Sequence, residues 1–275
     1  MKMLFLFPAL LLLASRAFCD LVDDGLVKKK NGDYDGAIAD FSKAIAQKSN
    51  YVAAYYDRGS AKKAKGDLDG AVADFTKAIE LKPQDPDAYI GRGIAKKSKG
   101  DLDGAIMDYS RAIALKPDYA LAYGHRGVAK KTKGDLDGAI GDYTKVIELK
   151  PDDFLSYFNR GNAKIAKEDW DGAVADYTKT IELKPDDVAA YNGRGGANLS
   201  KKDLDSAMRD YNKAISLKPD YAKAYANRSL VKRTQGDLKG ALTDLNKALE
   251  LKPSDTNLQA NIQADIEDVK KQMRK

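Results

Sequence analysis

The chain has 275 residues, of which 43% are hydrophobic and 32% charged, a composition typical of a folded protein and unlike that of a disordered one. The formal net charge is +6, but basic and acidic residues alternate and no basic block reaches the length of a nucleic-acid-binding tail. We therefore expect no nucleic-acid partner.

Residues 1–19 have the pattern of a secretory signal peptide. Lys2 supplies a short basic start, and residues 3–13 form an apolar run long enough for export but short for a membrane span. Cleavage after Ala17 or after Cys19 fits the small residues there, although a retained anchor stays open. We expect an extracytoplasmic protein, periplasmic or secreted, whose mature chain has no membrane span. Cys19 is the only cysteine, so the mature chain needs no disulfide.

A Gly-Asp dipeptide, or a close variant, recurs every 34 residues from Gly32-Asp33 to Gly236-Asp237. Seven occurrences in constant register predict one structural unit stacked seven times, each unit touching only its neighbours. The predicted array spans residues 20–255, and its units are 18–51, 52–85, 86–119, 120–153, 154–187, 188–221 and 222–255.

Each unit predicts two helices joined by a tight turn, as the fourth unit illustrates. Its second half places apolar residues at helical spacing, and its first half carries a shorter helix. Between them, Gly134 can adopt the left-handed conformation that ends a helix, and Asp135 can cap the next one. Pro151 ends the second helix. The apolar stripe of that helix consists of Leu136, Ala139, Ile140, Tyr143, Val146 and Ile147.

These units resemble tetratricopeptide repeats over residues 18–255. The resemblance rests on an aromatic residue at position four, Gly at eight, Gly-Asp at the turn, Ala at twenty, an aromatic at twenty-four and Pro at thirty-two. It implies an all-α fold, a right-handed α-solenoid of seven helix-turn-helix repeats, with a concave groove used for protein–protein interaction. Residues 256–275 predict a C-terminal capping helix, whose apolar face contains Leu258, Ile262, Ile266, Val269 and Met273.

Position seven departs from the family because it carries Arg in six units, while position twenty-three carries Asp in all seven. Pairing within a unit or between units is compatible with the spacing. The first unit has Asp24 at position seven, so pairing within it would set Asp24 against Asp40. We therefore expect a ladder between units, although solvated surface charges stay open as the alternative. The expected pairs are Arg58–Asp40, Arg92–Asp74, Arg126–Asp108, Arg160–Asp142, Arg194–Asp176 and Arg228–Asp210.

Lysines recur in the last turn of the first helices, for example Lys62, Lys63 and Lys65. Cations there suit the helix dipole, and a basic edge that attracts acidic segments is the functional alternative.

The resemblance implies that positions two, five, nine, twelve and thirteen line the groove. Apolar groups there favour an extended peptide or an amphipathic helix as partner, with Tyr56 and Phe158 as anchors, unless neighbouring units cover them. Arg233 is a further polar member. The predicted partner-binding residues are Tyr56, Lys63, Ile90, Ile94, Lys97, Leu121, Val128, Lys131, Leu155, Phe158, Asn162, Ile165, Asn192 and Leu199.

The sequence predicts no catalytic, cofactor or metal site. His125 is the only histidine and is interpreted as a surface substitution, whereas Trp170 is interpreted as a packing residue. No phosphate-binding loop and no metal-ligand spacing occurs in the sequence. We expect an exported, non-enzymatic scaffold that binds a peptide or protein segment. An accessory subunit of an envelope enzyme or assembly complex, or a self-associating structural repeat protein, stays open, as do the partner and the oligomeric state.

Overall fold

The computed structural model describes residues 20–274, and all the regular secondary structure in that range is helical. The predicted signal peptide and its cleavage sites lie outside the described residues. Residues 20–30 are helical and form the first helix of the first repeat.

The remaining helices alternate between first and second helices of the repeats and end with one further helix. The first helices are α3 (Val52–Lys65), α5 (Pro86–Ser98), α7 (Ala120–Lys133), α9 (Phe154–Ala166), α11 (Val188–Ser200) and α13 (Ala222–Thr234). The second helices are α2 (Tyr34–Gln47), α4 (Leu68–Leu81), α6 (Leu102–Leu115), α8 (Leu136–Leu149), α10 (Trp170–Leu183), α12 (Leu204–Leu217) and α14 (Leu238–Glu250). The chain ends with α15 (Thr256–Gln272).

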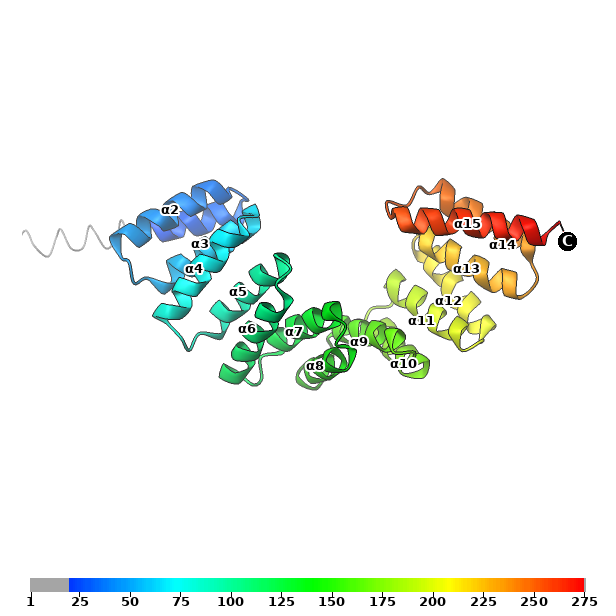
Figure 1. Cartoon of the computed structure of the whole chain (residues 1–275), viewed down its shortest axis with the longest axis horizontal. Helices are drawn as coiled ribbons and strands as arrows, with labels where there is room; N and C mark the ends of the chain where they lie inside the picture. Colours follow the sequence, from blue (N-terminus) through cyan, green and yellow to red (C-terminus); the bar gives the residue numbers. More distant parts are fainter. Residues whose placement is uncertain (1–19, 275) are drawn as a thin grey trace, which may run out of the picture. The chain divides into compact units, whose positions relative to one another are not determined.

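The chain forms two compact units. The first, Met1–Asp135, contains α2 to α7, and the second, Leu136–Lys275, contains α8 to α15. Within each unit, consecutive helices pack side by side, as Figure 1 shows for α3 with α4 and for α11 with α12. The expected all-α solenoid of stacked helix pairs is confirmed.

The turn inside each repeat follows from the Gly-Asp dipeptide. Gly66 has a φ of 94°, which ends α3, and the Asp67 carboxylate accepts a 2.9 Å hydrogen bond from the Gly70 amide, which caps α4. Glu168 and Lys202 occupy the glycine position of their repeats with φ values of 61° and 65°. These two residues therefore adopt a conformation that a side chain disfavours.

The core is built from one large residue of each second helix and small residues of the first helices. The ring of Tyr109 is fully buried, and a Cβ atom on Gly93 would lie 2.6 Å from it. A similar approach joins Gly195 to Tyr211 at 2.8 Å. The small residue expected at position eight is thus required by close packing between the two helices of a repeat.

Helix α15 covers the end of the second unit. Ile262, Ile266 and Val269 are at most 5% exposed and pack against Leu245 and Ala248 of α14. The N-terminus of α15 is capped by Asp255, whose carboxylate accepts from the amides of the first turn. The chain thus ends in the expected capping helix.

The predicted ladder between repeats is wrong, because the arginines pair within their own repeat. Arg58 makes a bidentate contact with Asp74, with Nη2–Oδ1 at 2.7 Å and Nε–Oδ2 at 2.9 Å. Its Nη1 donates to Ser42 Oγ of the preceding repeat at 3.0 Å, and its guanidinium lies 5.6 Å from the Tyr55 ring centroid. The same pairing occurs in Arg92–Asp108, Arg160–Asp176, Arg194–Asp210 and Arg228–Asp244.

The error came from overlooking the lysine at position eleven. In the second repeat, Lys62 Nζ lies 2.8 Å from Asp74 Oδ2, so each aspartate gathers two cations. In the first repeat, Lys28 Nζ binds Asp40 at 2.5 Å, and this hydrogen bond lowers the pKa of Asp40 despite the opposing effect of burial. Asp24 is exposed, so the repulsion that favoured pairing between repeats does not arise.

Candidate functional site

The first helices present one face that the core does not fully bury. We call the side chains at positions two, five, nine, twelve and thirteen of these helices the first-helix surface. Leu121 of α7 and Leu155 of α9 are 49% and 53% exposed there. Ile90 is only 4% exposed and belongs to the core, so it offers little surface to a partner. Asn192 is also buried, and the half-buried members are Tyr56, Lys63, Ile94, Lys97, Val128, Lys131, Phe158, Asn162, Ile165 and Leu199.

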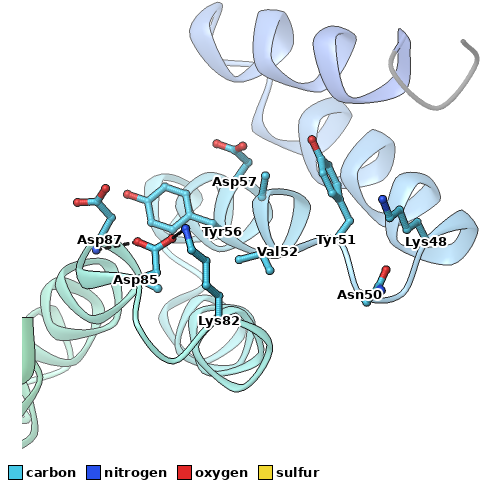
Figure 2. A pocket seen from close by; sticks show the side chains of 11 residues that line it. Lys48, Asn50, Tyr51, Val52, Tyr56, Asp57, Lys82, Asp85 and Asp87 are labelled. Carbon is cyan, nitrogen blue, oxygen red and sulfur yellow. Dashed lines mark hydrogen bonds and ion pairs between the residues drawn. The ribbon is translucent and has the colours of Figure 1, made fainter. Parts of the chain in front are cut away.

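In the first unit, a pocket of about 530 Å³ opens around Tyr56. Its walls come from the turn between α2 and α3, which carries Tyr51, and from the start of α5, which carries Asp85 and Asp87. Figure 2 shows the Tyr56 ring on the same side as these carboxylates, with Tyr51 and Lys48 on another wall. The pocket is therefore an open aromatic site bordered by charged groups.

The position of Tyr56 is fixed by packing. Its ring meets Phe75 edge to face, with the centroids 5.4 Å apart. Burial raises the pKa of Tyr56, and the carboxylates of Asp87, Asp57 and Asp85 raise it further. The phenol therefore stays protonated near neutral pH and can donate a hydrogen bond to a ligand.

The carboxylates of this pocket already have partners in the chain. Asp57 pairs with Lys29 at 2.5 Å and Asp85 pairs with Lys82 at 3.0 Å. Asp87 accepts a hydrogen bond from the Tyr119 hydroxyl. The pocket is close to neutral overall, so its best-defined contribution is the aromatic wall.

In the second unit, a pocket of about 440 Å³ lies between α9, α11 and the start of α13. It is lined by four predicted residues, Phe158, Asn162, Ile165 and Asn192, and Trp170 also lines it. The sequence thus predicted much of this pocket, whereas Trp170, interpreted as a packing residue, forms part of its wall.

Amide side chains give the second pocket its polarity. Asn192 Oδ1 accepts from Asn227 Nδ2 at 3.0 Å, and Asn162 Oδ1 accepts from the Tyr177 hydroxyl at 2.9 Å. Lys223 is the one charged residue among the described residues that line this pocket. Amides combine donors and acceptors, so together with the aromatic wall they suit the main chain of a peptide.

Each pocket also contains residues that the sequence analysis missed. Tyr51 and Tyr221 hold position thirty-four, and Asp87 and Lys223 hold position two of a following repeat. The signal for them was available, because position thirty-four alternates between Tyr and Asp in a chain that is otherwise regular there.

His125 lies in a different setting from the one expected. It is half-buried and stacks on Tyr109, with the ring centroids 5.6 Å apart and the planes at 20°. Burial lowers its pKa, and the charges of Lys97 and Lys63 lower it further. His125 is thus part of the first-helix region rather than a remote surface substitution.

Two searches of residues 20–274 bear on other classes of site. They contain no group of three or more His, Cys, Asp or Glu residues able to hold a metal ion. None of the helices in this range combines the length and the apolar character needed to cross a membrane.

Family models match almost the whole repeat region. A model described as TPR repeat matches residues 25–66, 59–100, 93–134 and 131–165. Two models described as tetratricopeptide repeat match residues 158–222 and 222–255. A comparison with curated protein sequences gives no match.

Solved structures similar to this chain are also repeat proteins. The crystal structure of MamA is 28% identical, covers 58% of this chain and 93% of its own, and has a TM-score of 0.56. YrrB, described as a TPR protein with an unusual peptide-binding site, is 24% identical, covers 69% and 97%, and has a TM-score of 0.57. The C-terminal part of a TPR repeat-containing protein from Cytophaga hutchinsonii is 22% identical, covers 85% and 96%, and has a TM-score of 0.71.

Proposed function

Because this chain belongs to the tetratricopeptide repeat family, we propose that it is a non-enzymatic scaffold that binds a peptide or helix of another protein on its first-helix surface. The observation that carries the proposal is the exposure of apolar side chains that the core does not use. Leu121 and Leu155 leave about half of their surface in water, at the same position of two first helices. Burying such groups against a partner is favourable by about 25 cal/mol per Å².

The two pockets support the same function. Each contains an aromatic side chain of the first-helix surface, Tyr56 in the first unit and Phe158 in the second, held by an edge-to-face contact with a core ring. Rigid aromatic groups in a pocket are efficient anchors, because little side-chain entropy is lost when a partner binds.

We also propose that the protein acts outside the cytoplasm. The support is the apolar run of residues 3–13 behind Lys2, followed by small residues. Fractionation of cells that produce the full chain, with mass spectrometry of its N-terminus, tests this proposal. A mature chain that starts at residue 18 or 20 outside the cytoplasm is expected, and an intact cytoplasmic chain would contradict it.

Substitution of the exposed leucines tests the binding surface. We expect Leu121→Asp combined with Leu155→Asp to abolish recovery of the partner in a pull-down from the native host, with the fold intact by circular dichroism. Met107→Asp is the matched control, because Met107 is 67% exposed on the second helix α6. Equal recovery of every partner by the wild type and the double variant would contradict the proposal.

A further inference from the structure

The lysines at position twelve of the first helices differ in whether the chain supplies them with a counter-charge. In the first repeat, Lys29 Nζ lies 2.5 Å from Asp57 Oδ1, and Asp57 holds position six of the second repeat. Both side chains are more than two-thirds buried. The array thus contains one complete lysine–carboxylate pair between neighbouring first helices.

The next two repeats have the lysine but lack the carboxylate. Lys63 of α3 and Lys97 of α5 repeat the position of Lys29, while Gly91 and His125 stand where Asp57 stands. Neither lysine side chain has a hydrogen-bond or ion-pair partner within residues 20–274. Their neighbours differ: Lys62 and Lys96 bind Asp74 and Asp108, and Lys65 and Lys99 bind Asp35 and Asp69.

The uncompensated charges lie close enough to affect one another. Lys63 is half-buried, and burial together with the charge of Lys29 lowers its pKa. The charges of Lys97 and Lys63 both act on His125, whose pKa burial has already lowered. Half-buried cations that repel one another raise the free energy of the unbound protein, and a bound anion relieves that cost.

The chain cannot easily supply the missing carboxylate itself. A Cβ atom added to Gly91 would lie 2.5 Å from the ring of Phe75, which is fully buried in the core. A side chain at Gly91 would therefore disturb that core, and a carboxylate for Lys63 has to come from outside the chain.

We propose that Lys63 and Lys97, with His125 beside them, bind side-chain carboxylates of an acidic segment of the partner polypeptide. The proposal rests on the proposed function, because it names the chemistry of a partner on the same first-helix surface. Asp57 shows the chemistry: a carboxylate is the group that occupies this place on Lys29. Lys131 holds position twelve of α7 and extends the row.

A labelled peptide of ten glutamates is the probe, and fluorescence anisotropy at low salt is the measurement. We expect saturable binding to the full mature chain, weakened about tenfold by Lys63→Gln combined with Lys97→Gln. Lys65→Gln combined with Lys99→Gln removes the same charge from paired lysines and should change the affinity less than about twofold. Asp57→Asn frees Lys29 and should strengthen binding. The thermal unfolding of each variant is measured alongside.

Several outcomes would overturn the proposal. They are the absence of saturable binding, an unchanged affinity in the folded Lys63→Gln, Lys97→Gln variant, or tighter binding of polyphosphate or single-stranded DNA than of the glutamate peptide. His125, the only histidine, gives a local readout by NMR. Peptide binding that leaves its ring signals unmoved would place the peptide elsewhere and would also contradict the proposal.

The result is separable from that of the proposed function. If Leu121→Asp combined with Leu155→Asp abolishes partner recovery but the lysine variants bind the glutamate peptide like the wild type, the function stands and the acidic partner is wrong. If the lysine variants alone lose the peptide while leucine variants recover every partner, the anion site stands and the wider surface is wrong.

Discussion

At the scale of single residues, the aspartate at position twenty-three is the charge centre of a repeat. Asp74 is 4% exposed, and its two oxygens accept from Arg58 and Lys62. The third nitrogen of Arg58 contacts Ser42 of the preceding repeat. One buried carboxylate therefore holds both the helices of its own repeat and, through the arginine, the neighbouring repeat.

Removing this carboxylate is predicted to be costly. We expect Asp74→Asn to destabilise the protein by about 3 kcal/mol, because it leaves two largely buried cations without their counter-charge. Asp69→Asn, which removes an exposed partner of Lys99, should cost less than about 0.5 kcal/mol. Chemical denaturation monitored by circular dichroism measures both, and equal costs would contradict the role of Asp74.

The left-handed residues give a prediction of the opposite sign. Glu168 has a φ of 61° at a turn where five other repeats have glycine. We expect Glu168→Gly to stabilise the protein by about 0.5–1 kcal/mol, since relief of the backbone strain exceeds the entropy cost of glycine. Glu168→Gln keeps the strain and removes the charge. If it stabilises as much as glycine in the same denaturation experiment, the strain account is wrong.

Pairing partners were harder to predict from sequence than the positions themselves. The separations of Arg58 from Asp74 and from Asp40 are nearly equal, so the first repeat had to decide, and Lys28 resolved the conflict there without an arginine. The lack of a counter-charge at Lys63 was also invisible, because no repeat pattern shows which position of the next helix faces it. His125 was misplaced for the same reason.

At the scale of elements, the capping helix shows how far an apolar stripe can be trusted. The sequence predicted one face for α15, and Ile262, Ile266 and Val269 are indeed buried. Leu258 is only half-buried and Met273 is 41% exposed, because the surface offered by α13 and α14 does not extend to both ends of the helix.

The cap should act locally. We expect Ile262→Ala to cost about 2–4 kcal/mol and to increase hydrogen exchange in α13 to α15, while amides of α3 to α5 keep their protection. Glu267→Ala, an exposed change on the same helix, is the control. Increased exchange throughout the chain would show that the repeats do not respond as neighbours only.

At the scale of the whole chain, the 34-residue period predicted the number, type and order of helices, because every repeat carries the same turn and the same core positions. It predicted the pockets less well. Both pockets take residues from the junction of two repeats, such as Tyr51 in the first unit and Lys223 in the second, and single-repeat reasoning leaves that junction out. The parts of the chain that vary from repeat to repeat are therefore the ones that give each site its chemistry.

The most direct test of the central claim is site-specific photo-crosslinking in the native host. A photoreactive residue is placed at Leu155, on the first helix α9, or at Met107, on the second helix α6. The account predicts that one polypeptide is crosslinked from position 155 and is absent from position 107. The same adduct from both positions, or an adduct from position 107 alone, would contradict the assignment of the first helices as the partner-binding surface.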